Sequence, residues 1–139
     1  MKILENKSLL KKLFWLWVIV IIILTAIPIP WLADAKIKTA SGFEFRLDYF
    51  AHTGLFFILF AFYYFWKLHL TLKVNNIHFL IFVIASLIFS YLDEFVQVFI
   101  PSRTYNIVDF YYNGFGIILG LILYLVFNNF LQNKCRENS

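Results

Sequence analysis

Three consecutive segments decide the fold of this chain: "FLIFVIASLIFSYL" at residues 79–92, "DEFVQVFIPSRTYNIVDFYYNG" at residues 93–114 and "FGIILGLILYLVF" at residues 115–127. The first and third are apolar and uncharged, as expected for the main part of a membrane helix, which needs about 17–25 mostly apolar residues. The second carries a set of polar side chains: Asp93, Glu94, Gln97, Arg103, Asp109 and Asn113. The pattern predicts two membrane helices joined by a turn that is rich in polar groups at the membrane rim.

The composition also indicates a membrane protein. Hydrophobic residues make up 62% of the 139 residues and charged residues 14%, whereas soluble domains average about 45–50% apolar and about 25% charged residues. The length fits one domain, residues 1–139. The net charge of +4 comes from scattered basic residues, which does not favour a nucleic-acid partner. The single Cys135 excludes an internal disulfide and a zinc site built from several cysteines.

Four uncharged stretches predict an all-α integral membrane protein with a four-transmembrane-helix bundle. Their approximate bounds are residues 13–33, 49–66, 74–92 and 110–130. The first stretch is longer than the apolar run of about 7–15 residues in a secretory signal peptide, so we expect it to be retained as a helix. "PIP" at residues 28–30 should break or kink its end. The connection at residues 34–47 is compatible with a short amphipathic strand or an interfacial helix.

Basic residues predict the orientation of the chain. Eight of the twelve Lys and Arg residues fall at the two termini and in the second connection, and four fall in the other two connections. Cytoplasmic loops carry an excess of Lys and Arg. We therefore expect both termini in the cytoplasm and the turn at residues 93–114 on the outer side.

Antiparallel threading brings the polar ends of three helices to that outer side. Asp48 and His52 open the second helix, and their i, i+4 spacing places them on one face. Asp109 and Asn113 repeat this spacing at the start of the fourth helix. The third helix closes with three more polar residues: Asp93, Glu94 and Gln97.

The acids at this rim outnumber the bases. A charged residue at the centre of a membrane helix costs about 2.5–3.5 kcal/mol, and such residues mark functional sites by default. Four carboxylates face Arg103 and His52: Asp48, Asp93, Glu94 and Asp109. They cannot all be charged, close together and dry, so some face water, or one is protonated, or a cation is bound.

Two motifs resemble the VanZ-like family of small bacterial membrane proteins. "LDYFAHTGLFFILF" at residues 47–60 is similar to the family's D-x-x-x-H opening of a hydrophobic helix, with Asp48 and His52 at the motif positions. "EFVQVFIPSRTYNIVDFYYNGFGIILG" at residues 94–120 is similar to its E-x-x-Q-x-x-x-P-x-R-x-x-x-x-x-D-x-x-x-N-x-x-G pattern. The matching positions are Glu94, Gln97, Pro101, Arg103, Asp109, Asn113 and Gly116.

The resemblance covers about residues 10–130, with two departures. Tyr49 stands where Lys often follows the Asp, and Ser102 stands where Gly usually precedes the Arg. The resemblance implies a location in the bacterial cytoplasmic (inner) membrane. The founding member of the family is associated with resistance to the glycopeptide antibiotic teicoplanin.

The residue types predict a ligand-binding or catalytic site. The planar guanidinium of Arg103 suits a phosphate or carboxylate, and Gln97 and Asn113 would add neutral hydrogen bonds to a substrate. The candidate catalytic residues are Asp48, His52, Glu94 and Asp109, with His52 and Asp48 as a base and its orienting partner, and Glu94 and Asp109 orienting Arg103 or exchanging protons. A purely structural network that pins the helix ends is the alternative.

No cofactor is expected. A metal site could be built from Asp48, His52, Glu94 and Asp109, but the dispersed histidines disfavour zinc, so no metal site is expected, although a divalent hard cation bound through oxygen ligands stays open. Ser102 has no G-x-S-x-G motif around it, which gives little support to serine catalysis. Gly116 and Gly120 form G-x-x-x-G, which in a bundle favours contact within the chain over dimerisation.

We therefore expect an envelope protein that binds or modifies an anionic lipid, a lipid-linked precursor or a lipophilic glycopeptide at the outer leaflet. The alternatives are a small proton-coupled transporter and a non-catalytic interaction subunit. A carrier should need acidic groups at mid-membrane depth or at both faces, which this sequence lacks.

Overall fold

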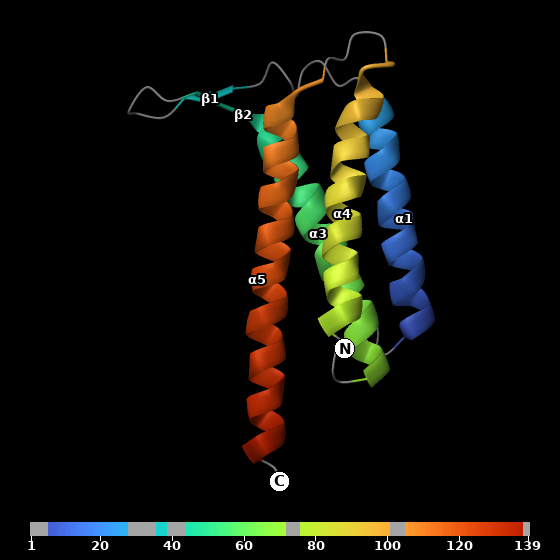
Figure 1. The fold of residues 1–139 in the computed structure, drawn as a ribbon, viewed down its shortest axis with the longest axis vertical. Helices are drawn as coiled ribbons and strands as arrows, with labels where there is room; N and C mark the ends of the chain where they lie inside the picture. The colour runs from blue at the N-terminus through green and yellow to red at the C-terminus, as the bar shows by residue number, and fades with distance from the viewer. Residues whose placement is uncertain (1–5, 28–35, 39–43, 72–75, 101–104, 138–139) are drawn as a thin grey trace.

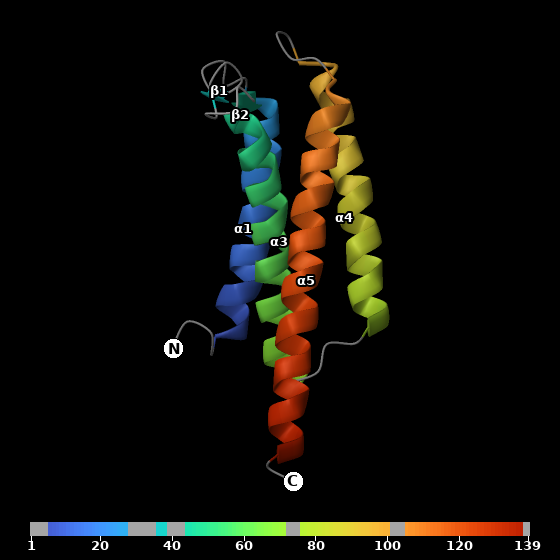
Figure 2. The same cartoon turned by 90° about the vertical axis from the view of Figure 1, so that its left-hand side faces the viewer.

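The computed structural model describes residues 6–27, 36–38, 44–71, 76–100 and 105–137. They form four long helices and one short hairpin, in which neighbouring helices of the chain run antiparallel (Figures 1 and 2). The helices are α1 (Lys7–Ala26), α3 (Leu47–Thr71), α4 (Asn76–Gln97) and α5 (Ile107–Glu137). Strands β1 (Lys36–Lys38) and β2 (Glu44–Arg46) pair antiparallel, with Lys36 opposite Arg46.

All four helices are long and apolar enough to span a membrane. Their outer faces carry large apolar side chains that are about half exposed in the isolated chain, among them Ile19, Ile84 and Ile118. An apolar exterior of this kind is suited to lipid and unsuited to water. The predicted four-helix membrane bundle is therefore confirmed. At about 1.5 Å per residue, α5 is longer than the membrane is thick, and its apolar part covers Ile107–Phe130.

The helix ends differ from the predicted spans for local reasons. α1 starts seven residues into the chain, where the Asn6 side chain accepts a hydrogen bond from the Leu9 amide at 3.1 Å. It ends at Ala26, and Ile27 adopts an extended conformation (φ −91°, ψ 118°). Residues that precede proline are driven out of the helical region. The "PIP" sequence itself, at 28–30, lies outside the described residues.

Two glycines bring α5 against α3. Gly116 and Gly120 are both buried, and a Cβ atom at Gly116 would collide with the backbone oxygen of Thr53 on α3. A Cβ atom at Gly120 would collide with the side chain of Phe60, also on α3. The G-x-x-x-G pair thus serves contact within the chain, which is the role that sequence analysis favoured.

Aromatic rings fill the half of the bundle near the start of α1 and the end of α5. The rings of Tyr63 and Phe82 stack with centroids 3.6 Å apart, and those of Phe79 and Tyr124 stack at 3.7 Å. Phe14 of α1 closes the cluster through edge and tilted contacts to neighbouring rings. We call this half, defined by Phe14, Tyr63, Phe79, Phe82 and Tyr124, the aromatic end.

The connection between α1 and α3 forms short strands, which is one of the two alternatives predicted from its sequence. β2 runs directly into α3, so Arg46 is the last residue of the strand and Leu47 the first of the helix. This continuity fixes Arg46 beside the first turn of α3, where Asp48 lies.

Candidate functional site

Buried polar side chains gather at the opposite end of the bundle. In Figure 1 this is the end that carries β1 and β2, away from the first residues of α1 and the last residues of α5. The polar residues come from the end of α1, the start of α3, the end of α4 and the start of α5. We call this region the polar end and define it by Thr25, Arg46, Asp48, His52, Asp93, Glu94, Gln97, Asn106, Asp109 and Asn113.

At its centre, the imidazole of His52 lies between two carboxylates from different helices. Its Nδ1 is 3.6 Å from Oε1 of Glu94, and its Nε2 is 3.7 Å from Oδ2 of Asp109. Glu94 is fully buried, and the side chains of Asp109 and His52 are only 7% and 13% exposed. The arrangement joins α3, α4 and α5 through three ionisable groups that are held almost out of contact with solvent.

Two amides hold Glu94 and His52 in place. Asn113 of α5 donates from Nδ2 to Oε1 of Glu94 at 3.2 Å, and its Oδ1 lies 3.0 Å from Nδ1 of His52. Gln97, one turn after Glu94 on α4, donates to the other Glu94 oxygen at 3.1 Å. Both amides are buried. Because both Glu94 oxygens accept hydrogen bonds, this carboxylate has a fixed orientation toward His52.

Arg46 and Asp48 form an ion pair at the edge of this cluster, which we call its rim. Arg46 donates from Nε to Asp48 at 3.1 Å and makes a second bond from its terminal nitrogen to the other Asp48 oxygen. Its guanidinium also lies 5.2 Å from the ring centroid of Tyr49, which stacks on Tyr112 of α5. The hydrogen bond with Asp48 raises the pKa of Arg46 above its ordinary value, although burial acts in the other direction. Arg46 therefore remains a fixed positive charge at the rim.

Asp93 faces a different helix from its neighbour Glu94. Oγ1 of Thr25, on α1, lies 2.5 Å from Oδ1 of Asp93. Adjacent positions on a helix point about 100° apart, so Glu94 is directed to α3 and α5 while Asp93 is directed to α1. The contact ties α1 to the polar end.

Asn106 prepares the start of α5. Its side-chain oxygen accepts from the Val108 amide at 3.1 Å, which is the geometry of a helix N-cap. Its Nδ2 donates to Oδ1 of Asp109 at 2.8 Å. Asn106 thus fixes one Asp109 oxygen and leaves the other directed at His52.

The structure brings together five of the seven residues predicted from the sequence: His52, Glu94, Gln97, Asp109 and Asn113. Asp48 lies at the rim and pairs with Arg46, while Asn113, Glu94 and Asp109 are the polar partners of His52. Arg103 lies outside the described residues, together with Pro101 and Ser102.

Three residues of the polar end escaped sequence analysis. Asn106 carried a usable signal, because Asn directly before an apolar helix with Asp three positions later favours a cap. Arg46 was counted only for topology, and Thr25 resembled any other threonine in an apolar helix.

The comparisons with known proteins agree with the two sequence motifs. The family model VanZ/LLP1 matches residues 14–128, which include all of the central cluster. The chain belongs to the VanZ/LLP1 family. No curated protein and no solved structure matches the chain. The resemblance on the motifs of residues 47–60 and 94–120 is thereby confirmed, and the chain is a VanZ-like multi-pass membrane protein.

The polar end of this VanZ-like protein offers two kinds of chemistry. An imidazole between two carboxylates can take up and release a proton, as in general acid–base catalysis. The same three residues can also hold a metal ion, because one ligand atom from each of His52, Glu94 and Asp109 lies within 4.8 Å of the others. Both uses depend on the same buried side chains.

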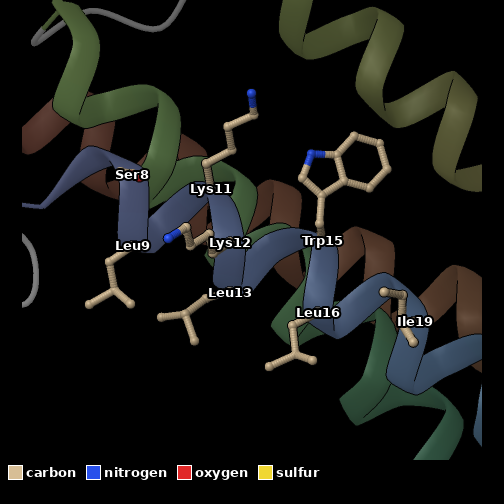
Figure 3. Close-up of a pocket in the computed structure, with 8 residues that line it drawn as sticks. All are labelled: Ser8, Leu9, Lys11, Lys12, Leu13, Trp15, Leu16 and Ile19. Atoms are coloured by element: carbon tan, nitrogen blue, oxygen red, sulfur yellow. The ribbon is translucent and has the colours of Figure 1, made fainter.

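A shallow groove at the other end of α1 contrasts with this cluster (Figure 3). In the close-up, Lys11 and Trp15 project to one side of α1, and Leu9 and Leu16 project to another. The groove is lined by Ser8, Leu9, Lys11, Lys12, Leu13, Trp15, Leu16 and Ile19. Lysine and tryptophan beside apolar residues are typical of a helix end at the membrane interface. The groove therefore has the composition of a lipid-facing surface, and the His52–Glu94–Asp109 cluster within the polar end is the candidate functional site of the VanZ-like bundle.

Proposed function

We propose that this VanZ-like protein binds or chemically modifies an anionic lipid, a lipid-linked envelope precursor or a lipophilic glycopeptide at the outer leaflet of the bacterial cytoplasmic membrane. The observation that carries the proposal is the buried His52–Glu94–Asp109 cluster at the polar end. Interhelical hydrogen bonds in membranes average about 0.6 kcal/mol each. Holding the helices together is therefore a weak reason to bury three ionisable groups from three helices.

An anionic ligand is favoured by two arginines, one seen in the structure and one in the family motif. Arg46 is described at the rim, and Arg103 follows Glu94 by nine residues in the family motif. A guanidinium binds phosphate or carboxylate through two parallel hydrogen bonds. Because Arg46 is already paired with Asp48, we assign the first contact with the ligand to Arg103 and a supporting role to Arg46.

Chemical modification of the ligand is favoured by the position of His52. Each ring nitrogen faces a different carboxylate, so a proton taken up at one nitrogen is stabilised by the acid beside it. This is the arrangement of a general base with orienting partners. In this reading His52 receives the proton, Glu94 orients the ring and Asp109 stabilises the charged form.

A proton-coupled carrier is disfavoured by where the acids lie. Among the described residues, the buried carboxylates are Asp48, Asp93, Glu94 and Asp109, and all four belong to the polar end. A relay across the membrane needs acidic groups at more than one depth. The described part of the chain therefore favours a site that opens to one side.

The orientation has a direct test through Cys135, the only thiol of the chain. With both termini in the cytoplasm, a membrane-impermeant maleimide should leave Cys135 unlabelled in intact cells and label it after permeabilisation. Rapid labelling in intact cells would reverse the topology and move the polar end to the cytoplasmic leaflet.

The function is tested in a deletion strain by mass spectrometry of its lipids and by its sensitivity to teicoplanin. We expect the deletion to accumulate or lose an anionic lipid species, and the wild-type gene to restore the profile. Arg103→Ala and Glu94→Gln should fail to restore it although the protein accumulates in the membrane. Asp93→Asn is the matched control, because Asp93 is a buried acid of the same turn that faces α1, and it should restore the profile.

The structural alternative makes a different prediction for the same variants. If the polar residues only pin the helix ends, Arg103→Ala and Glu94→Gln should lower the amount of protein and leave the function of each remaining molecule unchanged. Restoration of the lipid profile by Arg103→Ala at normal protein levels would refute the anionic-ligand proposal.

A further inference from the structure

We propose that His52, Glu94 and Asp109 bind a divalent transition-metal ion, Zn²⁺ or Mn²⁺, at the centre of the polar end. The inference goes beyond the proposed function, because binding of the ion requires no lipid and can be measured without one. It uses the same cluster, so with the ion bound His52 would be a ligand and not the general base of the proposed function, and the ion would supply open coordination positions to a ligand.

The donor set suits such an ion. One imidazole and two carboxylates offer one nitrogen and up to four oxygens, and all potential ligands come from helices that pack together in the bundle. Imidazole with carboxylates is a common donor set for Zn²⁺, and Mn²⁺ accepts the same groups. Two buried carboxylates also favour a doubly charged cation over a singly charged one.

The hydrogen-bond network fixes which nitrogen of His52 is available. The amide NH₂ of Asn113 donates to Glu94, so the amide oxygen is the atom that faces Nδ1 of His52 at 3.0 Å. An oxygen acceptor at that distance assigns the hydrogen of a neutral ring to Nδ1. The Nε2 atom then carries a lone pair, and it is directed at the carboxylate of Asp109. Two acceptors that face each other require a proton or a cation between them.

The separation of these two acceptors favours a cation. The Nε2–Oδ2 distance of 3.7 Å is longer than an N–H···O hydrogen bond, which spans about 2.7–3.2 Å. Two ligands of a tetrahedral ion with bonds of about 2.0–2.2 Å lie about 3.3–3.6 Å apart. Glu94 is the third candidate ligand, because one ligand atom from each of the three residues lies within 4.8 Å of the others, and its oxygen would move toward the ion on binding.

The surrounding groups resemble the supports of known metal ligands. A histidine that binds a metal usually donates its other ring N–H to an oxygen, and ligating carboxylates are themselves hydrogen-bonded. Asn113 accepts from His52, Gln97 donates to Glu94 and Asn106 donates to Asp109. Each of the three proposed ligands therefore has at least one amide that holds its orientation.

An independent observation comes from Ser90, one helical turn before Glu94 on the same face of α4. Its side chain is fully buried, and its hydroxyl has no hydrogen-bond partner among the described residues. Buried hydroxyls without a partner are rare. Side chains at i, i+4 lie about 5–6 Å apart, a gap that a water bound to the ion would bridge. Such a water, held by the ion, is the partner that we assign to this hydroxyl.

The test uses the full chain purified in detergent without chelators. We expect about one Zn²⁺ or Mn²⁺ per chain by elemental analysis, removal by EDTA, and restoration when Zn²⁺ or Mn²⁺ is added in competition with a fluorescent chelator. The melting temperature of the EDTA-treated protein should rise on addition of the ion, since a ligand that binds only the folded state stabilises it. No bound metal, together with no response to either ion, would overturn the proposal.

Variants assign the ligands. His52→Gln and Asp109→Asn should weaken ion binding by more than about 100-fold, beyond the loss of about 10–100-fold that follows from changing a supporting group. Asp93→Asn should bind as tightly as the wild type. Equal binding by all variants would identify an adventitious ion only, and equal loss in Asp93→Asn would remove the assignment to these three residues.

A spectroscopic measurement on the wild type protects the test against variants that fail to fold. X-ray absorption of the zinc-loaded protein should show nitrogen and oxygen ligands, with the signature of one imidazole. A sulfur ligand would place the ion at Cys135 and overturn the proposal. Failure of the proposed function can be told apart from failure of this inference. In that case the deletion strain would have an unaltered lipid profile, while the purified protein would still bind the ion.

Discussion

The two ends of the bundle are held together by different chemistry. At the aromatic end, stacked rings such as Tyr63 on Phe82 and Phe79 on Tyr124 fill the space between helices. At the polar end, His52, Glu94 and Asp109 meet at distances set by hydrogen bonds to amides. Ring packing tolerates small rotations of each side chain, whereas a hydrogen-bonded cluster works only in one arrangement.

This difference separates stability from specificity within one small molecule. Lipid tails are as apolar as the helices, so association in the membrane depends on close packing and on polar contacts. Close packing is supplied by the rings and by the approach of Gly116 to α3. At about 0.6 kcal/mol for each interhelical hydrogen bond, the polar end adds little stability for the number of groups that it buries.

The largest loss of protein is expected from a change at the contact between α3 and α5, on which the aromatic end and the polar end both depend. Gly116→Val should prevent accumulation of the protein, because even the first side-chain carbon collides with the backbone of α3 at Thr53. The collision separates α5 from α3 along their length. Gly114→Val is the matched control, since a Cβ atom at Gly114 meets nothing within 4 Å. Immunoblots of membrane fractions measure both, and equal levels of the two variants would contradict the proposed helix contact.

The next effect should be confined to the aromatic end. Phe82→Ala removes the ring that stacks on Tyr63 and contacts Phe14 and Phe60. Phe→Ala costs about 3–5 kcal/mol in soluble cores, and we expect the lower part of this range because lipid removes much of the transfer term. Thermal unfolding in detergent should show the loss, and ion binding at a temperature where the variant is folded should match the wild type. Loss of ion binding by the folded variant would show that the two ends are not separate.

At the polar end we expect the opposite result: a small loss of stability and a large loss of ion binding. Asn113→Ala removes two hydrogen bonds, one to His52 and one to Glu94. At about 0.6 kcal/mol for each interhelical bond, the melting temperature should fall less than in Phe82→Ala. Affinity for Zn²⁺ should nevertheless fall about 10–100-fold, because Asn113 holds two of the three ligands. A variant that melts lower than Phe82→Ala and binds Zn²⁺ normally would invert the comparison.

The smallest effect on stability is expected from changes to Asn106, the N-cap of α5, and these changes test its role as a cap. Asn106→Ala should cost about 1 kcal/mol, as expected for the loss of an N-cap side chain, and should loosen Asp109 because Asn106 donates to it. Asn106→Ser keeps a capping oxygen but removes the donation to Asp109. Thermal unfolding should therefore separate Ala from Ser, whereas ion affinity should be reduced a few-fold in both. Identical melting of the two variants would count against the cap.

The fold and the gathering of the polar residues could be predicted because they follow from coarse properties. Hydropathy gives the number of helices, and antiparallel threading places His52, Glu94 and Asp109 at one end whatever the packing angles. The family motif contained the amides Gln97 and Asn113. The first span was drawn too long, to about residue 33, because hydropathy continues through Ile27 to Trp31, although a break or kink was expected at residues 28–30; α1 ends just before them, at Ala26.

The partners of each side chain could not be predicted, because they depend on the rotation of each helix about its axis. Asp48 and His52 share a helix face by their i, i+4 spacing, which made them an attractive pair. In the structure the hairpin delivers Arg46 to Asp48, and α5 delivers Asn113 to His52. Thr25 meets Asp93 across 68 positions of sequence, and no spacing rule relates them.

The hydrogen bond between Asn113 and Glu94 links two helices that follow each other in the chain. Helices made in succession can enter the bilayer as one hairpin, and this bond lies at the closed end of that hairpin. We expect the growing chain to shield its Glu94 carboxylate with the amide of α5 before His52 docks from α3. Docking of α3 would then complete the cluster.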